Sequence, residues 1–174
     1  GPPFFVLATQ NPYEFEGTYT LPESQLDRFL IRLQLGYPDR QAERLILSGH
    51  REGEPVEHLE SVLSGEEVVA LQGKVREVRV QDSLADYMLD LVEATRDHPE
   101  VRLGASTRAA LALYRAAQSL ALVNNRSYVI PDDVKYLARP VLAHRLLARR
   151  GRVGQVDAAG HVIDEIVRKT PIPS

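Results

Sequence analysis

The chain of 174 residues contains no cysteine, no tryptophan and only one methionine. Without cysteine no disulfide framework can form, which fits a reducing compartment, and we expect a cytoplasmic protein. The apolar runs are far shorter than the roughly 20 residues that cross a bilayer, so the sequence predicts no membrane span. A composition of 44% hydrophobic and 26% charged residues is typical of a globular protein.

Lysine is scarce as well, since 18 of the 21 basic residues are arginine. Arginine suits bidentate contacts with phosphate and carboxylate better than lysine does, although genomic base composition is the simpler explanation of the bias. The net charge of −3 argues against a dedicated nucleic-acid binder, in which a basic surface supplies most of the affinity.

The chain does not begin with methionine, and Gly1-Pro2-Pro3 leads at once into the apolar run Phe4–Ala8. We therefore expect a part of a longer protein. The run is typical of a central strand covered on both faces. A second strand is predicted over Ile31–Leu35, where apolar and polar residues alternate. Two isolated strands cannot bury both faces alone, so we interpret them as the rim of a larger sheet.

Most of the remaining chain is predicted to be helical. Capping-box spacing starts a short helix near Leu21 and a second helix at Ser64. Hydrophobic periodicity and turn residues predict the other helices, over about 40–50, from 84 to before 99, over 106–123, from 131 and over 158–169. The stretch 109–123 is apolar almost all round, so we expect it at the centre of a bundle. Residues 51–64 have the composition of a loop or linker.

The predicted fold is mainly α, a helical bundle preceded by a partial α/β fragment of two strands and a short helix. We expect the α/β fragment to occupy residues 1–38, a connecting helix and linker 39–64, and the helical domain 65–174.

Asn11 is the first candidate site residue, because it follows the end of the predicted strand Phe4–Ala8. Ligands of open parallel sheets bind beyond the carboxyl ends of the strands. A neutral amide there can accept from an attacking water and donate to a phosphate oxygen. The alternative is that Asn11 belongs to a simple turn before Pro12.

Arg28 is the second candidate, at the end of the short helix between the apolar residues Leu26 and Phe29. Those anchors would display the arginine rigidly. An arginine delivered to a γ-phosphate raises hydrolysis on the order of 10³–10⁵-fold. The alternative is a salt bridge to Asp27 or Glu23.

Arg108 is the third candidate, in the first turn of a helix that Gly104-Ala105-Ser106 opens. A positive side chain opposes the helix dipole there, at a cost of a few tenths to about 1 kcal/mol. Helix starts favour anions, so an arginine beside free backbone N–H groups completes an anion site. The alternative is a solvated arginine.

Other motifs do not carry chemistry. Val162-Ile163-Asp164-Glu165 imitates a magnesium-binding strand but has a helical period, and Gly73-Lys74 lacks the rest of a phosphate loop. The five histidines have no metal-ligand spacing, and we interpret them as surface or cap residues. We therefore predict no metal site in this sequence.

The motifs around the candidates resemble the MoxR family of AAA+ ATPases, relatives of the magnesium-chelatase ATPase subunit. The resemblance rests on residues 8–12, 16–19 and 21–29 for the ATPase core, and on 104–109 and 129–134 for the family's lid domain. Departures are small, with Thr20 and Thr107 where proline is common and Ser24 where alanine is common.

The resemblance implies that Asn11 is sensor 1, Arg28 the arginine finger and Arg108 sensor 2, acting on its own or a neighbouring nucleotide. It also implies that the intact protein uses ATP and Mg²⁺ in a hexameric ring, whereas this part binds neither tightly and, lacking the phosphate loop, does not hydrolyse ATP. Chaperone-like maturation or metal-cofactor insertion is the implied role, with a von Willebrand factor A-domain protein or a metalloenzyme as partner. A helical protein-interaction or nucleic-acid module without ATPase function is the alternative.

Overall fold

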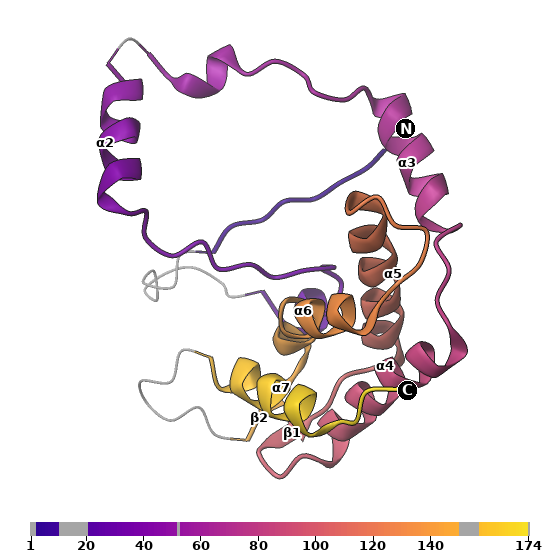
Figure 1. Ribbon diagram of the computed structural model, residues 1–174. Coiled ribbons are helices and arrows are strands. Elements are labelled where there is room, and N and C mark those ends of the chain that lie inside the picture. Colours follow the sequence, from indigo (N-terminus) through magenta and orange to yellow (C-terminus); the bar gives the residue numbers. More distant parts are fainter. Residues whose placement is uncertain (1–2, 11–20, 52, 150–156, 174) are drawn as a thin grey trace.

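The computed structural model describes residues 3–10, 21–51, 53–149 and 157–173. In chain order, its helices and strands are α1 (Glu23–Leu26), α2 (Arg40–Gly49), the 3₁₀ turn η1 (Pro55–His58), α3 (Gly65–Val75), α4 (Asp82–Asp97), β1 (Val101–Leu103), α5 (Thr107–Val123), α6 (Pro131–Leu142), the 3₁₀ turn η2 (Ala143–Arg145), β2 (Leu147–Ala148) and α7 (Ala158–Lys169). The predicted fold class, a helical bundle preceded by a small α/β part, is confirmed (Figure 1).

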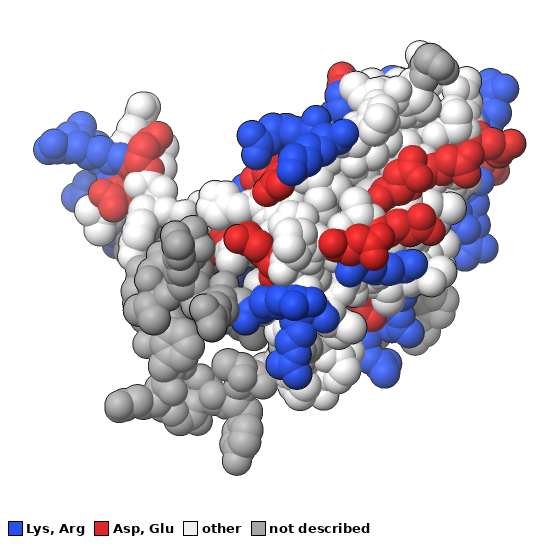
Figure 2. Space-filling model, turned by 90° about the horizontal axis from the view of Figure 1, so that it is seen from below, with Lys and Arg blue, Asp and Glu red and all other residues white. Residues whose placement is uncertain are grey.

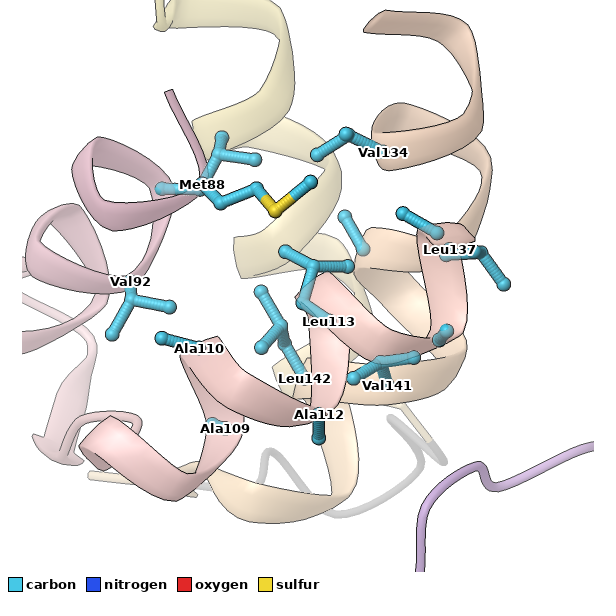
Figure 3. Close-up of a cluster of buried hydrophobic side chains, with 14 of the residues drawn as sticks. Met88, Val92, Ala109, Ala110, Ala112, Leu113, Val134, Leu137, Val141 and Leu142 are labelled. Atoms are coloured by element: carbon cyan, nitrogen blue, oxygen red, sulfur yellow. The ribbon is translucent and has the colours of Figure 1, made fainter. Parts of the chain in front are cut away.

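The hydrophobic core lies entirely in the bundle, since the buried apolar side chains of the described residues run from Val78 to Ile166. Helix α5 packs against α4, α6 and α3, so its predicted central position is correct. In Figure 3 the side chains of Met88, Leu113 and Val134 point toward one another from α4, α5 and α6. Helix α5 is not buried all round, however, because Leu111 and Val123 are exposed.

Helix α4 follows its predicted period closely. Its buried residues recur every three or four positions and so lie on one face, namely Leu84, Tyr87, Met88, Leu91, Val92 and Thr95. The predicted start of α3 is also confirmed, because the Glu67 N–H donates to Ser64 Oγ (3.2 Å) and the Ser64 N–H donates to the Glu67 carboxylate (2.7 Å).

Two short extended contacts join segments that are distant in the sequence. Strands β1 and β2 form an antiparallel pair, and Arg79 makes a parallel bridge with Tyr128. The pairing of β1 with β2 was not predicted, because its strands are three and two residues long and distant in the sequence.

Neither predicted strand of the N-terminal part forms within the described residues. Phe4 and Leu7 are 86% and 85% exposed, and Leu35 is 96% exposed. Strands need hydrogen-bonded neighbours, and the second segment makes a single backbone bond, from the Arg32 N–H to the Pro140 carbonyl oxygen (2.9 Å). Figure 1 shows the following chain, with α2, in a wide excursion from the bundle before it returns at α3.

In the ranges that the structure describes, no helix is long and apolar enough to cross a membrane.

Candidate functional site

Arg28 lies in the turn that follows α1, and its side chain is exposed. The turn closes through backbone bonds from the Arg28 N–H to the Gln25 carbonyl and from the Phe29 N–H to the Leu26 carbonyl, both 3.1 Å. Among the described residues, the carboxylate of Asp27 makes no ion pair with the adjacent Arg28. Instead Asp27 Oδ1 lies 3.2 Å from Arg145 Nε and Asp27 Oδ2 lies 3.8 Å from Arg108 Nε.

Arg108 occupies the first turn of α5, as predicted, and its side chain is 57% exposed. Ser106 takes the N-cap position but makes no side-chain capping bond. The distance of 3.8 Å to Asp27 is too long for a hydrogen bond, so Arg108 is paired only loosely. The structure thus brings Arg108 to the residue beside Arg28, while Asn11, the third predicted site residue, lies outside the described residues.

The start of α5 is fixed to α4 by close contacts. Thr95 Oγ1 donates to the Val92 carbonyl (2.6 Å) and accepts from the Ala105 N–H (2.9 Å), while Arg96 Nε donates to the Ala105 carbonyl (3.1 Å). A Cβ at Gly104 would lie 2.6 Å from the Arg96 Cα, so this close approach requires glycine. These contacts determine where the first turn of α5 presents Arg108.

Arg145 fixes the turn that carries Arg28. Its side chain is 2% exposed, and the guanidinium donates to the carboxylate and carbonyl of Asp27 and to the carbonyls of Phe29 and Leu30. Burial lowers the pKa of Arg145 and nearby Arg108 lowers it further, whereas the carboxylate of Asp27 raises it. The carboxylate of Asp27 therefore compensates part of the cost of burying the charge of Arg145.

His144 binds the same turn. Its Nε2 lies 3.0 Å from the Phe29 carbonyl oxygen, which requires the proton on Nε2 because a carbonyl can only accept. Burial is the main cause that lowers the pKa of His144; the carbonyls of Phe29 and Pro140 oppose it, and the charges of Arg145 and Arg32 add to it. A neutral imidazole therefore suits this position.

The histidine and arginine of η2 were missed by the sequence analysis. The prediction that the five histidines are surface or cap residues is wrong for His144, which is 8% exposed. The missed signal is helical spacing: His144 and Arg145 follow Val141 by three and four residues and continue the buried face of α6. Polar residues on such a face must have partners, and the partners come from residues 27–30.

Two motifs that the sequence analysis set aside lie in helices. Asp164 and Glu165 lie in α7, and Gly73 and Lys74 lie in α3, so both pairs are helical. Over the described residues, no group of three or more histidine, aspartate or glutamate side chains is arranged to hold a metal ion.

Two protein-family models match the chain. The model of the AAA lid domain matches residues 93–168, and that of the ATPase family associated with various cellular activities (AAA) matches residues 1–31. The first covers the bundle from α4 to α7, and the second ends just after the turn that carries Arg28.

Curated relatives cover nearly the whole chain. The uncharacterized protein YeaC of Bacillus subtilis is 46% identical over 98% of this chain and 53% of its own length. Chaperone MoxR1 of Mycobacterium tuberculosis is 38% identical over 98% of this chain and 47% of its own length. Protein MoxR of Paracoccus denitrificans is 28% identical over 97% of this chain and 56% of its own length. The chain therefore spans about half the length of these relatives.

A crystal structure of a "putative ATPase" from Cytophaga hutchinsonii superposes with a TM-score of 0.88 at 35% identity, over all of this chain and 56% of that chain. The lid match, the ATPase match, the MoxR-named relatives and this structure all agree. The chain belongs to the MoxR family of AAA+ ATPases and comprises a lid domain with part of the ATPase domain.

Proposed function

We propose that the intact protein binds and hydrolyses ATP in a ring, with Arg28 as the arginine finger and Arg108 as sensor 2. The observation that carries the proposal is the position of Asp27, which directly precedes Arg28 and whose Oδ2 lies 3.8 Å from Nε of Arg108 in the lid. Two separated parts of the sequence thus each bring an arginine residue close to Asp27. Asn11 is proposed as sensor 1 from its sequence context.

The residues at this place suit a phosphate ligand. Arg108 and Arg145 face the single carboxylate of Asp27, and Arg28 follows Asp27 in the sequence. The side chains of Arg28 and Arg108 are exposed. A terminal phosphate can be contacted by Arg28 and Arg108 while Arg145 stays with Asp27. The described residues offer no ligand set for Mg²⁺, so we assign none of the metal's binding to them.

Partners of the intact protein follow from its relatives. One of them is named a chaperone, which supports the proposed role in remodelling or maturing client proteins. Metal-cofactor insertion is proposed from the family resemblance of the sequence. A von Willebrand factor A-domain protein or a metalloenzyme remains the proposed partner. Exposed apolar residues of the N-terminal part, such as Phe4, Leu7 and Leu35, would pack against the rest of the ATPase domain.

Nucleic-acid binding is less favoured. On the face in Figure 2, groups of lysine and arginine are separated by acidic and uncharged surface, and the net charge is −3. A positive phosphate-contacting stripe supplies most nucleic-acid affinity.

Arg28→Ala in the intact protein tests the proposal. We expect ATP binding to stay within a few-fold while turnover falls on the order of 10³-fold, because the finger contacts charge that develops in the transition state. Steady-state phosphate release and equilibrium nucleotide binding measure the two effects. The matched control is Arg168→Ala, an exposed arginine at the far end of α7. Normal turnover of Arg28→Ala would remove the finger assignment. The 174-residue chain, assayed alongside, should release no phosphate.

A further inference from the structure

The turn of residues 27–30, which we call the finger turn, receives most of its hydrogen bonds from the helical bundle through one side chain, that of Arg145. Arg145 Nε lies 3.2 Å from Asp27 Oδ1 and 3.3 Å from the Asp27 carbonyl oxygen, and Nη1 lies 3.2 Å from the Leu30 carbonyl oxygen. Nη2 donates to the Phe29 carbonyl. All three guanidinium nitrogens therefore bind the turn that contains Arg28.

The same guanidinium is tied to the lid. Arg145 Nη1 also donates to the Val141 carbonyl in the last turn of α6, so one side chain joins α6 to the finger turn. His144 adds a parallel contact through its Nε2 and the Phe29 carbonyl. Because the Arg145 side chain is only 2% exposed, water cannot easily replace these bonds when the turn moves.

The contacts fix the backbone on both sides of Arg28 and leave its side chain exposed. This division suits a finger, whose base must be immobile while its tip reaches another surface. A lysine at position 145 would keep the charge but could not satisfy so many acceptors, since the planar fork of five donors is particular to arginine.

Asp27 also connects the finger turn to the proposed sensor. Its two carboxylate oxygens face Arg145, in η2 just after α6, and Arg108, in the first turn of α5. A displacement of the lid that moves α5 or α6 therefore acts on the finger turn through the same carboxylate.

We propose that Arg145 is the positioning residue of the arginine finger, which couples the lid to the finger turn and sets turnover rather than ATP affinity. The inference rests on the proposed role of Arg28. A purely structural role is the competing explanation, in which Arg145 only stabilises the bundle.

The test is a double-mutant cycle in the intact protein with Arg28→Ala, Arg145→Gln and the double variant. A misplaced catalytic group costs on the order of 10²-fold, so we expect Arg145→Gln to lower kcat about 10²-fold with KM for ATP within about threefold. Since Arg145 acts through Arg28, the double variant should be no slower than Arg28→Ala alone. Arg145→Lys should recover only a small part of the rate.

Hydrogen–deuterium exchange supplies a readout that does not depend on activity. In Arg145→Gln, amides of the finger turn should exchange faster, while those of α4 and α5 keep their protection. Asp27→Asn gives a second variant if Arg145→Gln folds poorly, and it should also lower kcat. The matched control is Arg126→Gln, which removes another lid guanidinium, bound to Asp133, without touching the finger turn. It should lower the melting temperature but leave kcat unchanged.

The outcomes separate the two claims. If Arg28→Ala lowers turnover but Arg145→Gln and Asp27→Asn, both folded, keep normal kcat, the positioning role is wrong and the finger assignment stands. If the losses in kcat of the two single variants multiply in the double variant, Arg145 acts independently of Arg28, and the positioning role is wrong in that case too. If Arg28→Ala itself is fully active, the proposed function fails and the positioning role fails with it.

Discussion

At the scale of single residues, Gly104 shows how a missing side chain sets the geometry of the site. A Cβ at this position would lie 2.6 Å from the Arg96 Cα and 2.8 Å from its backbone nitrogen, and backbone cannot rotate away as a side chain can. Gly104→Ala must push the start of α5 away from α4. We expect a loss of about 1–3 kcal/mol in the free energy of unfolding, measured by chemical denaturation.

Gly73→Ala is the matched control for that substitution. Gly73 lies inside α3, and a Cβ there would meet no atom within 4 Å. Alanine has less backbone freedom than glycine, so the substitution should raise the free energy of unfolding by about 0.5–1 kcal/mol if α3 unfolds together with the bundle. If α3 unfolds separately, the free energy of unfolding of the bundle should not change. Equal losses in the two variants would mean that the close approach at Gly104 has no special cost.

At the scale of elements, the turn η2 makes the fold sensitive to pH. His144 is buried with Nδ1 lacking a partner among the described residues, and Arg145 and Arg32 lie close enough to lower its pKa further. The unfolded chain takes up a proton near pH 6.5, which the folded chain resists. Unfolding is therefore favoured as the pH falls below about 6.5, and the stability is regained as the pH rises.

Denaturation at pH 7.5 and 5.5 measures this effect. His144→Gln keeps a donor for the Phe29 carbonyl but does not titrate, so we expect it to lose less stability between the two pH values than the wild type loses. His161→Gln, at an exposed position of α7, should keep the wild-type difference. The same pH dependence in all three proteins would show that His144 is not the titrating group.

The elements that the sequence predicted are those whose signals are local. Helix α4 repeats its apolar residues every three or four positions, and Ser64 with Glu67 forms a capping box within one turn. The two N-terminal strands were predicted wrongly because an apolar run or an alternating pattern indicates residues to be buried but does not supply the partner strand. The burial of Arg145 could have been predicted from its spacing after Val141, but its partners in residues 27–30 could not, since they lie more than a hundred residues earlier.

The site was predictable to a similar extent. The first-turn position of Arg108 follows from the residues around it, and Arg28 follows a short helix as expected. The role of Asp27 does not follow from the sequence: it entered only as one possible partner of Arg28 in the alternative interpretation, and in the structure it contacts Arg108 and Arg145. Long-range pairing of polar groups is decided by the packing of α5 and α6, which the sequence does not show.

At the scale of the whole molecule, the N-terminal part and the bundle contribute unequally to stability. No buried apolar residue of the described chain precedes Val78, and α2 and α3 contain no buried residue. Polar contacts join residues 27–32 to the bundle: those of Arg145 and His144, the looser pair of Arg108 with Asp27, and the Arg32–Pro140 backbone bond. The bundle should therefore hold its core without the preceding chain.

A shortened chain of residues 77–174 tests this division. It keeps every buried apolar side chain described here, so we expect a helical circular dichroism spectrum and a single cooperative thermal transition. It loses α3, which packs against α5 without a buried side chain of its own, and it loses the partners of Arg145 in residues 27–30. Since the freed Arg145 can bind water, the free energy of unfolding should fall by only about 1–3 kcal/mol. Asp27→Ala in the 174-residue chain, which removes the carboxylate but leaves the bundle intact, should cause a loss in the same range. A shortened chain without a cooperative transition would mean that the N-terminal part helps to build the core, and the lid could then no longer be treated as a unit that moves the finger turn through Arg145.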